Sequence, residues 1–195
     1  MDNIVITAAA NVCHADLQDA RLGSRFGRMD LASQLALLAV ERLGINFDAL
    51  PRERIAICLG AKAGSLTTDM EYWKGRDGVG GPSPTLFTYT LPSAAIGEIA
   101  IRHRLTGPNL CFVGNGRDVL PEAADLLRRG EADGCVCVYV NAVSGGLSGW
   151  ICTVPAFHAC AAFLQKGEKG LHVLREIDRD MELLCDNLRP RKSTK

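Results

Sequence analysis

The chain has 195 residues, of which 22 are Lys or Arg and 22 are Asp or Glu, so its formal net charge is zero. This balance argues against nucleic acid or an anionic membrane surface as the main partner, because both select basic proteins. Hydrophobic residues make up 47% of the chain, which is typical of a globular protein. A chain of this length buries roughly 70% of its unfolded surface, so we expect one domain that folds without disulfides or metals.

Strands and helices are expected to alternate along most of the chain. Short β-branched or apolar runs predict strands at 3–8, 54–60, 109–113 and 134–140. Apolar residues at helical spacing, together with capping residues and a first-turn proline, predict helices at 30–43, 92–105 and 118–129. Two further strands, at 159–164 and 171–177, are expected to form a hairpin around the turn at 166–170.

This order of elements predicts the fold class. Strands that are linked by helices run parallel, and such sheets carry helices on both faces. We therefore expect a three-layer α/β fold with a mostly parallel, five-stranded sheet, helices on both faces and an antiparallel edge strand.

An uncharged stretch at 134–165 is long enough to span a bilayer. An asparagine, a proline and several glycines interrupt it, so we expect no membrane span but two apolar runs joined by a Gly-rich loop. The loop, at 142–157, is unusually apolar and contains Trp150 and Phe157. A loop of this kind is expected to be covered by the rest of the fold, by a ligand or by another chain.

No Cys-x-x-Cys pair occurs among the eight cysteines, which are Cys13, Cys58, Cys111, Cys135, Cys137, Cys152, Cys160 and Cys185. Their spacing is unlike that of zinc sites and thioredoxin-like redox motifs. The chain starts with Met-Asp-Asn and has no secretion signal. We therefore expect a cytoplasmic protein with reduced, mostly buried thiols and with neither a metal nor a cofactor. A soft metal held by Cys135 and Cys137 on one strand face is the alternative.

Three segments carry specific motifs. Residues 90–102 read Thr-Leu-Pro-Ser-Ala-Ala-Ile-Gly-Glu-Ile-Ala-Ile-Arg, residues 105–110 read Leu-Thr-Gly-Pro-Asn-Leu, and residues 123–133 read Ala-Ala-Asp-Leu-Leu-Arg-Arg-Gly-Glu-Ala-Asp. In order and spacing they resemble the N-terminal half of the β-ketoacyl synthases, the condensing enzymes of the thiolase-like fold. The first looks like that family's Leu-Pro-Asn-Ala-Ala-x-Gly-His-Ile-Ala-Ile-Arg helix, and the second is similar to the Gly-Pro-Asn motif that begins its nucleophile strand.

The resemblance implies the N-terminal half of a thiolase-like fold at 1–178, followed by a C-terminal helix and basic tail at 179–195. In an active β-ketoacyl synthase a second, similar half supplies the two histidines, or His and Asn, that handle decarboxylation. The chain ends soon after the first half, so we expect the second half to be missing. The four histidines match no catalytic motif; His103 is expected on the surface and His158 in the core.

The family's nucleophile is a cysteine at a strand-to-helix turn, where the helix N-terminus lowers its pKa. Counting from Gly-Pro-Asn without a gap places Gly116 at that position, and glycine cannot carry an acyl group. Cys111 is expected inside the preceding strand as a buried thiol, and it is a nucleophile only if the register is unusual. The resemblance therefore implies no catalytic residue, and we favour a pseudoenzyme over an enzyme.

A chain length factor is the implied analogue. Such proteins resemble ketosynthases, lack the nucleophile and pair with an active ketosynthase in fatty acid, polyketide or polyene biosynthesis; self-association is also open. Because the family dimerises along the nucleophile strand, the candidates for the interface or the acyl-pocket wall are Leu86, Phe87, Phe112, Asn115, Trp150 and Phe157.

Two alternatives remain open. The chain could be a reduced acyl-transfer or condensing enzyme that uses a thiol such as Cys111. It could also be a stand-alone module that binds acyl carrier protein. Carrier proteins are acidic, so the docking candidates are basic: Arg102, Arg104, Arg128 and Arg129.

Overall fold

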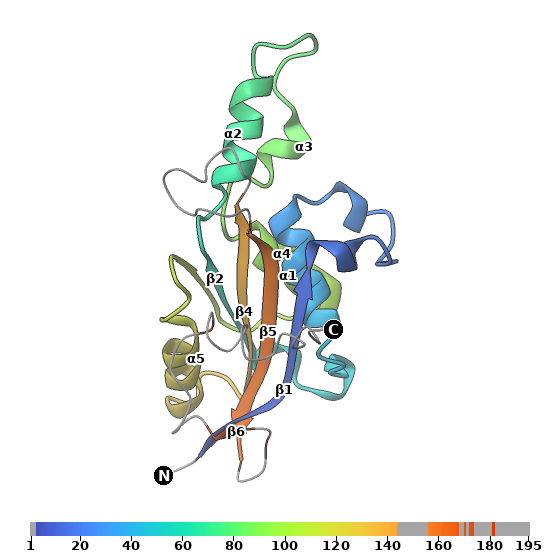
Figure 1. Cartoon of the computed structure of the whole chain (residues 1–195). Coiled ribbons are helices and arrows are strands. Elements are labelled where there is room, and N and C mark those ends of the chain that lie inside the picture. Colours follow the sequence, from blue (N-terminus) through green and yellow to red (C-terminus); the bar gives the residue numbers. More distant parts are fainter. Residues whose placement is uncertain (1–2, 144–155, 168–169, 171, 174–180, 182–195) are drawn as a thin grey trace, which may run out of the picture.

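A six-stranded sheet lies at the centre of the computed structural model, which describes residues 3–143, 156–167, 170, 172, 173 and 181 (Figure 1). In chain order the strands are β1 (Ile4–Cys13), β2 (Ile55–Ala61), β3 (Asn109–Val113), β4 (Gly134–Val143), β5 (Ala156–Lys166) and β6 (His172–Val173). Across the sheet they follow the order β3-β2-β4-β5-β1-β6.

Helices cover both faces of this sheet. One face carries α1 (Leu31–Glu41) and α4 (Ala94–His103), and the other carries α5 (Val119–Arg128) (Figure 1). Two further helices, α2 (Leu66–Gly75) and the short α3 (Pro84–Phe87), extend beyond the carboxyl ends of β2 and β4 (Figure 1). The three predicted layers and the predicted helices are therefore confirmed.

The direction of the strands differs in part from the expectation. β2 is parallel to β3 and to β4, whereas the pairs β4–β5, β5–β1 and β1–β6 are antiparallel. β1, β2, β3 and β4 share one direction, but β5 inserts between β4 and β1 in the opposite direction and makes both of its own pairings antiparallel. The sheet is thus mixed rather than mostly parallel, and its six strands correspond to the six segments predicted as strands.

The expected hairpin between the last two strands does not form. β1 lies between β5 and β6, with Ile6 opposite Leu164 on one side and His172 on the other. Val5 and Ile6 are fully buried, so the apolar residues of β1 favour an interior place in the sheet over an edge. The antiparallel edge strand itself is present as β6.

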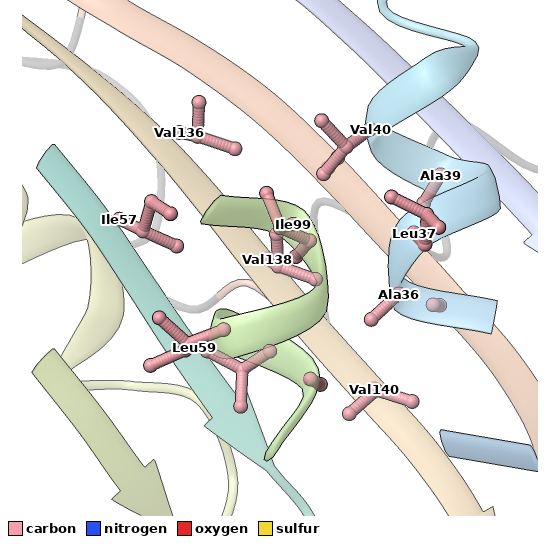
Figure 2. Packing of buried hydrophobic residues seen from close by; sticks show 14 of the residues in the cluster. Ala36, Leu37, Ala39, Val40, Ile57, Leu59, Ile99, Val136, Val138 and Val140 are labelled. Carbon is pink, nitrogen blue, oxygen red and sulfur yellow. The ribbon is translucent and has the colours of Figure 1, made fainter. Parts of the chain in front are cut away.

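The core consists of two layers, one on each face of the sheet. Successive side chains of β4 point alternately into one layer and the other. Val136, Val138 and Val140 point toward α1 and α4, where they pack with Ile57, Leu59 and Ile99 (Figure 2). Cys135, Cys137 and Tyr139 point toward α5. Successive residues of a strand face opposite sides, so one run of apolar residues serves both layers.

Hydrogen bonds of one residue, Asp30, link the first turn of α1 to α2. Asp30 is the N-cap of α1, and its Oδ1 accepts a hydrogen bond from the Ser33 N–H at 3.0 Å. Its Oδ2 accepts from the Thr68 hydroxyl of α2 at 2.8 Å. The predicted cap therefore also holds α2 near the carboxyl ends of the strands.

None of the helices within the described ranges is long and apolar enough to cross a bilayer. The proposed boundary at 178 falls where only Met181 is described, so the division into 1–178 and 179–195 stays a prediction.

Candidate functional site

The turn between β3 and α5 follows the Gly-Pro-Asn motif, whose resemblance predicts the nucleophile position at Gly116. Gly116 lies in this turn with a φ of +75°, a left-handed backbone that favours glycine. A Cβ atom built on Gly116 would lie 2.6 Å from Cδ2 of Tyr139. This distance is far inside van der Waals contact, so the turn as folded has no room for any side chain at Gly116.

Tyr139 fills this space from β4. It is fully buried, and in the parallel register of β2 and β4 it lies opposite Gly60. A Cβ on Gly60 would come within 2.9 Å of Val119 Cγ2 and 3.2 Å of the Gly116 Cα. Two glycines therefore let the turn and the start of α5 pack directly against β2, with the aromatic ring of Tyr139 alongside both.

Cys111 faces away from this turn. Its side chain packs with the core layer under α1 and α4, whereas its neighbours Leu110 and Phe112 pack with the layer under α5. Burial raises the pKa of the Cys111 thiol, which lowers the fraction present as the reactive thiolate. The structure thus places the thiol inside β3, as expected, and separates it from the turn.

The residues predicted to line the interface or the acyl-pocket wall lie in different parts of the fold. Leu86 and Phe157 line the same cavity, of about 480 Å³, beside the first turns of α1 and α2. Phe87 is 60% exposed and its ring lies 5.4 Å from that of Tyr72. Phe112 is half-buried on β3 and Asn115 is exposed in the following turn. Trp150 lies outside the described residues.

The four predicted docking arginines form two pairs on opposite faces of the sheet. Arg102 and Arg104 lie at the end of α4, whereas Arg128 and Arg129 lie at the end of α5. Arg102 forms an ion pair with Glu41 at 2.8 Å, and Arg129 pairs with Asp125 and with Glu131. Two of the four charges are thus already compensated within the chain.

His103 is not a surface residue, contrary to expectation. Its side chain is only 14% exposed, and its ring lies 4.7 Å from that of Phe47. Burial lowers the pKa of His103. The helix turns this residue toward Phe47 and Glu41 of α1, a direction that the neighbouring arginines do not reveal. His158 is buried, as expected.

Three thiols meet under α5. Cys135 Sγ lies 3.6 Å from Cys58 Sγ and 3.9 Å from Cys137 Sγ. Burial raises the pKa of Cys135 and Cys137, so these thiols behave as packed apolar groups. Cys160 is disulfide-bonded, so the expectation of reduced thiols is wrong for this residue. Within the part of the chain that is described, no group of three or more His, Cys, Asp or Glu is arranged to hold a metal.

Sequence reasoning missed two features of this region. Tyr139 was overlooked because its role depends on contact with a turn more than twenty residues earlier, although an aromatic residue amid the Val and Cys of β4 is a signal. The second is Leu91, which was not among the predicted interface residues: it is 64% exposed, as is Val113 at the end of the strand that was predicted to dimerise. Gly64 brings their two segments together, since a Cβ built on it would lie 3.2 Å from Pro92 and 3.5 Å from Val113.

Several proteins of known family or structure are similar to this chain. The sequence model for the N-terminal domain of the β-ketoacyl synthases matches residues 14–165. The structure described as the ishigamide ketosynthase/chain length factor has a TM-score of 0.69 and 19% identity, over 87% of this chain and 64% of that chain. The ketosynthase (ApeO) in complex with its chain length factor (ApeC) from Xenorhabdus doucetiae has a TM-score of 0.64 and 15% identity, over 85% and 79% of the two chains.

A third similar structure is AntDE:AntF, a type II PKS acyl-carrier protein in complex with its ketosynthase bound to the hexaketide. Its TM-score is 0.69 and its identity 16%, over 85% of this chain and 63% of that chain. The chain thus spans less than two thirds of the ishigamide and AntDE:AntF structures. No curated protein matches the sequence. The solved structures share the thiolase-like fold at low identity, and the family match at 14–165 covers most of the chain, which therefore belongs to the β-ketoacyl synthase family through its N-terminal domain.

Proposed function

We propose that the chain is a non-catalytic ketosynthase-like protein that pairs with an active β-ketoacyl synthase, in the manner of a chain length factor. The non-catalytic part is supported by one observation at Gly116, the residue that the motif resemblance assigns to the nucleophile position: Tyr139 fills the space that a side chain there would need. An acyl group needs both an attacking atom and room around it. The described turn offers neither.

The edge of β3 is the surface that supports pairing. Among the described strands, β3 has a hydrogen-bonded neighbour on one side only. An open strand edge is a template for a strand of another chain. At its end, exposed Val113 and Leu91 add apolar surface. The ketosynthase/chain length factor structures to which this chain is similar are themselves paired assemblies by description. The pathway, whether fatty acid, polyketide or polyene synthesis, depends on the partner.

Pairing is tested by co-purification with a full-length ketosynthase encoded beside this chain. We expect a stable complex by size-exclusion chromatography with light scattering. Val113→Arg places a charge at the β3 edge and should abolish the complex. Gln18→Arg adds the same charge at an exposed position after β1, on the other side of the sheet, and should leave the complex intact. A monomer that ignores the ketosynthase contradicts the proposal.

The enzymatic alternative is tested separately with an acyl-thioester analogue and mass spectrometry. We expect no acylation of the native protein, because the raised pKa of the Cys111 thiol keeps it protonated. Stoichiometric attachment to Cys111, lost in Cys111→Ser, would overturn the non-catalytic assignment and leave the pairing result unaffected.

A further inference from the structure

A polar cavity lies at the end of the sheet opposite the turn at Gly116. Its volume is about 400 Å³, within the range of small-molecule sites. The ends of α1 and α4 form two of its walls, and the segment at 45–48 forms the third. These helices lead into β2 and β3, so the cavity lies at the amino ends of those strands, whereas Gly116 follows the carboxyl end of β3.

Both carboxylates in the wall of this cavity already pair with arginines. Glu41 Oε1 accepts a hydrogen bond from Arg102 Nε at 2.8 Å, and Asp48 pairs with Arg52. Arg104 is exposed at the rim and forms no hydrogen bond or ion pair within the described part of the chain. The side-chain charge that is left without a partner is therefore positive.

Arg104 has a backbone conformation that favours glycine. Its φ is +57°, and among the described residues it is the only one other than glycine with a positive φ. A left-handed residue at a helix end is usually glycine, so an arginine here costs stability. No described contact of its side chain offsets this cost, which suggests a role in binding.

The carbonyl groups at the ends of α1 and α4 add partial negative charge near the cavity. Several of them already accept hydrogen bonds from the residues that follow. The Ala100 carbonyl accepts from the N–H groups of Arg104 and Leu105, and the Leu38 carbonyl accepts from Arg42. The arginine side chains therefore remain the groups with free capacity to hold a ligand.

His103 has an unsatisfied nitrogen in the wall between the two helices. Its Nε2 is buried and has no hydrogen-bond partner among the described residues. Glu41 Oε1 lies 3.6 Å from it, which is too far for a hydrogen bond. Burial is the main cause of the lowered pKa of His103, and Arg102 adds to it. Glu41 and Asp48 oppose this shift without cancelling it, so the ring is neutral near pH 7.

Glu41 can be compensated in two ways, because the same oxygen faces two donors. Its Oε1 accepts from Arg102 and is also the oxygen that lies near His103 Nε2. An anion that binds Arg102 competes with Glu41 for the guanidinium group. A proton on Nε2 would then give Glu41 a replacement donor.

We propose that this cavity binds a small oxyanion, through a carboxylate or phosphate group, between Arg102 and Arg104. One proton from the solvent enters with the anion. It is held on His103 Nε2, which donates to Glu41 when Arg102 turns to the ligand. The site goes beyond the pairing with a ketosynthase and does not depend on it, because none of its described lining residues comes from β3 or from the turn at Gly116.

Three probes test the chemistry of the ligand: succinate, sulfate as a phosphate analogue that does not titrate, and succinamide. Succinamide has nearly the shape of succinate without its charge. Binding is measured on the whole protein at pH 7 by isothermal titration calorimetry. We expect succinate or sulfate to bind, and succinamide to bind at least about tenfold more weakly than the anion. Failure of both anions to bind, or equal binding of succinamide, overturns the proposal.

The proton is tested by calorimetry in two buffers with different ionisation enthalpies. We expect uptake approaching one proton per bound anion in the native protein and none in His103→Gln. The native affinity should rise as the pH falls from 8 to 6, by at most about tenfold per pH unit. Glu41→Gln should bind the anion more tightly and without proton uptake, because the competing carboxylate is gone. Anion binding without proton uptake in the native protein contradicts the exchange of partners at Glu41.

Arg104→Gly separates binding from folding. Glycine suits the left-handed backbone, so this variant should melt at a higher temperature than the native protein and yet bind the anion about tenfold more weakly or not at all. Lys74→Ala is the control, because it removes an exposed cation from α2, at the other end of the sheet. It should bind the anion like the native protein. Unchanged affinity in Arg104→Gly contradicts a site in this cavity.

Discussion

At the scale of single residues, Gly116 and Tyr139 close the turn between β3 and α5 together. A glycine in an open turn tolerates a single substitution, because the new side chain meets no neighbouring atom. Here the ring of Tyr139 occupies that space, and the backbone of Gly116 is left-handed. The turn has therefore become part of the core, and its two residues depend on each other.

We expect Gly116→Ala to destabilise the protein by about 2–4 kcal/mol, as the sum of left-handed backbone strain and overpacking against Tyr139. Gly130→Ala is the matched control, because Gly130 has a φ of +73° but no atom within 4 Å of its added Cβ. Urea unfolding of both variants separates clash from strain. Equal losses in the two variants would show that Tyr139 does not close the turn.

The same pair can be examined by a double-mutant cycle. Combining Gly116→Ala with Tyr139→Ala should cost less than the two single changes added together, because the smaller side chain removes the clash. If the losses of stability in the two single variants add up exactly to the loss in the double variant, Gly116 and Tyr139 do not depend on each other.

At the scale of elements, a buried carboxylate ties three segments together. Glu98 of α4 is 4% exposed and receives two hydrogen bonds from Arg25, at 2.6 and 3.0 Å. The Tyr89 hydroxyl, from the segment between α3 and α4, donates to the same carboxylate at 2.9 Å. Burial of such a charge is tolerated because both of its oxygens have donors.

This cluster predicts a pH dependence. Desolvation first, and then the hydrogen bond and charge of Glu98, raise the pKa of Tyr89 to about 12. A tyrosine in the unfolded chain has a pKa of about 10, so the folded state holds its proton longer. The contribution of Tyr89 to stability is thus complete below about pH 10 and is lost as the pH rises toward 12.

Urea unfolding of the native protein and of Tyr89→Phe across this pH range measures the effect. We expect the difference in unfolding free energy to shrink between about pH 10 and 12. If the difference in unfolding free energy between the two proteins stays constant over this pH range, the pKa of Tyr89 is not raised by folding.

Elements were predicted from the sequence far better than their arrangement. β3 spans Asn109–Val113, the predicted bounds, because its apolar run and the flanking Gly-Pro and Gly residues are local signals. The order of the sheet was not predictable in the same way, since the place of β1 between β5 and β6 depends on pairing over long distances. The same difference applies at the candidate site. Gly116 was identified by counting from the Gly-Pro-Asn motif, whereas the contact of Tyr139 with Gly116 is visible only in the folded chain.

At the scale of the whole molecule, the exposed large apolar side chains gather on one side. Among the described residues, large apolar side chains are exposed at Trp73, Val79, Phe87, Leu91, Ile101 and Val113. Most of them lie on or beside α2 and α3 or at the end of β3. By contrast, α5 ends in Arg128 and pairs Arg129 with Asp125 on its outer side. The proposed pairing would bury the apolar side chains at the end of β3.

Hydrogen exchange should map the paired surface. In the isolated protein we expect fast exchange of β3 amides that do not bond to β2, because they face an open edge. Adding the ketosynthase should slow exchange in β3 more than anywhere else, while β6, the opposite edge strand, serves as the internal control. Protection that appears at α5 rather than at β3 would contradict this orientation.

The interior position of β1 also has a consequence for how the chain reaches its fold. The Thr7 hydroxyl donates to the Phe163 carbonyl across 156 residues of sequence. During synthesis, β1 therefore leaves the ribosome before its two partners, β5 and β6, and stays unpaired until most of the chain has been made. Such long-range pairing slows folding and prolongs the exposure of unpaired strand edges. Folding yield should thus depend on chaperone protection of β1 while it is unpaired.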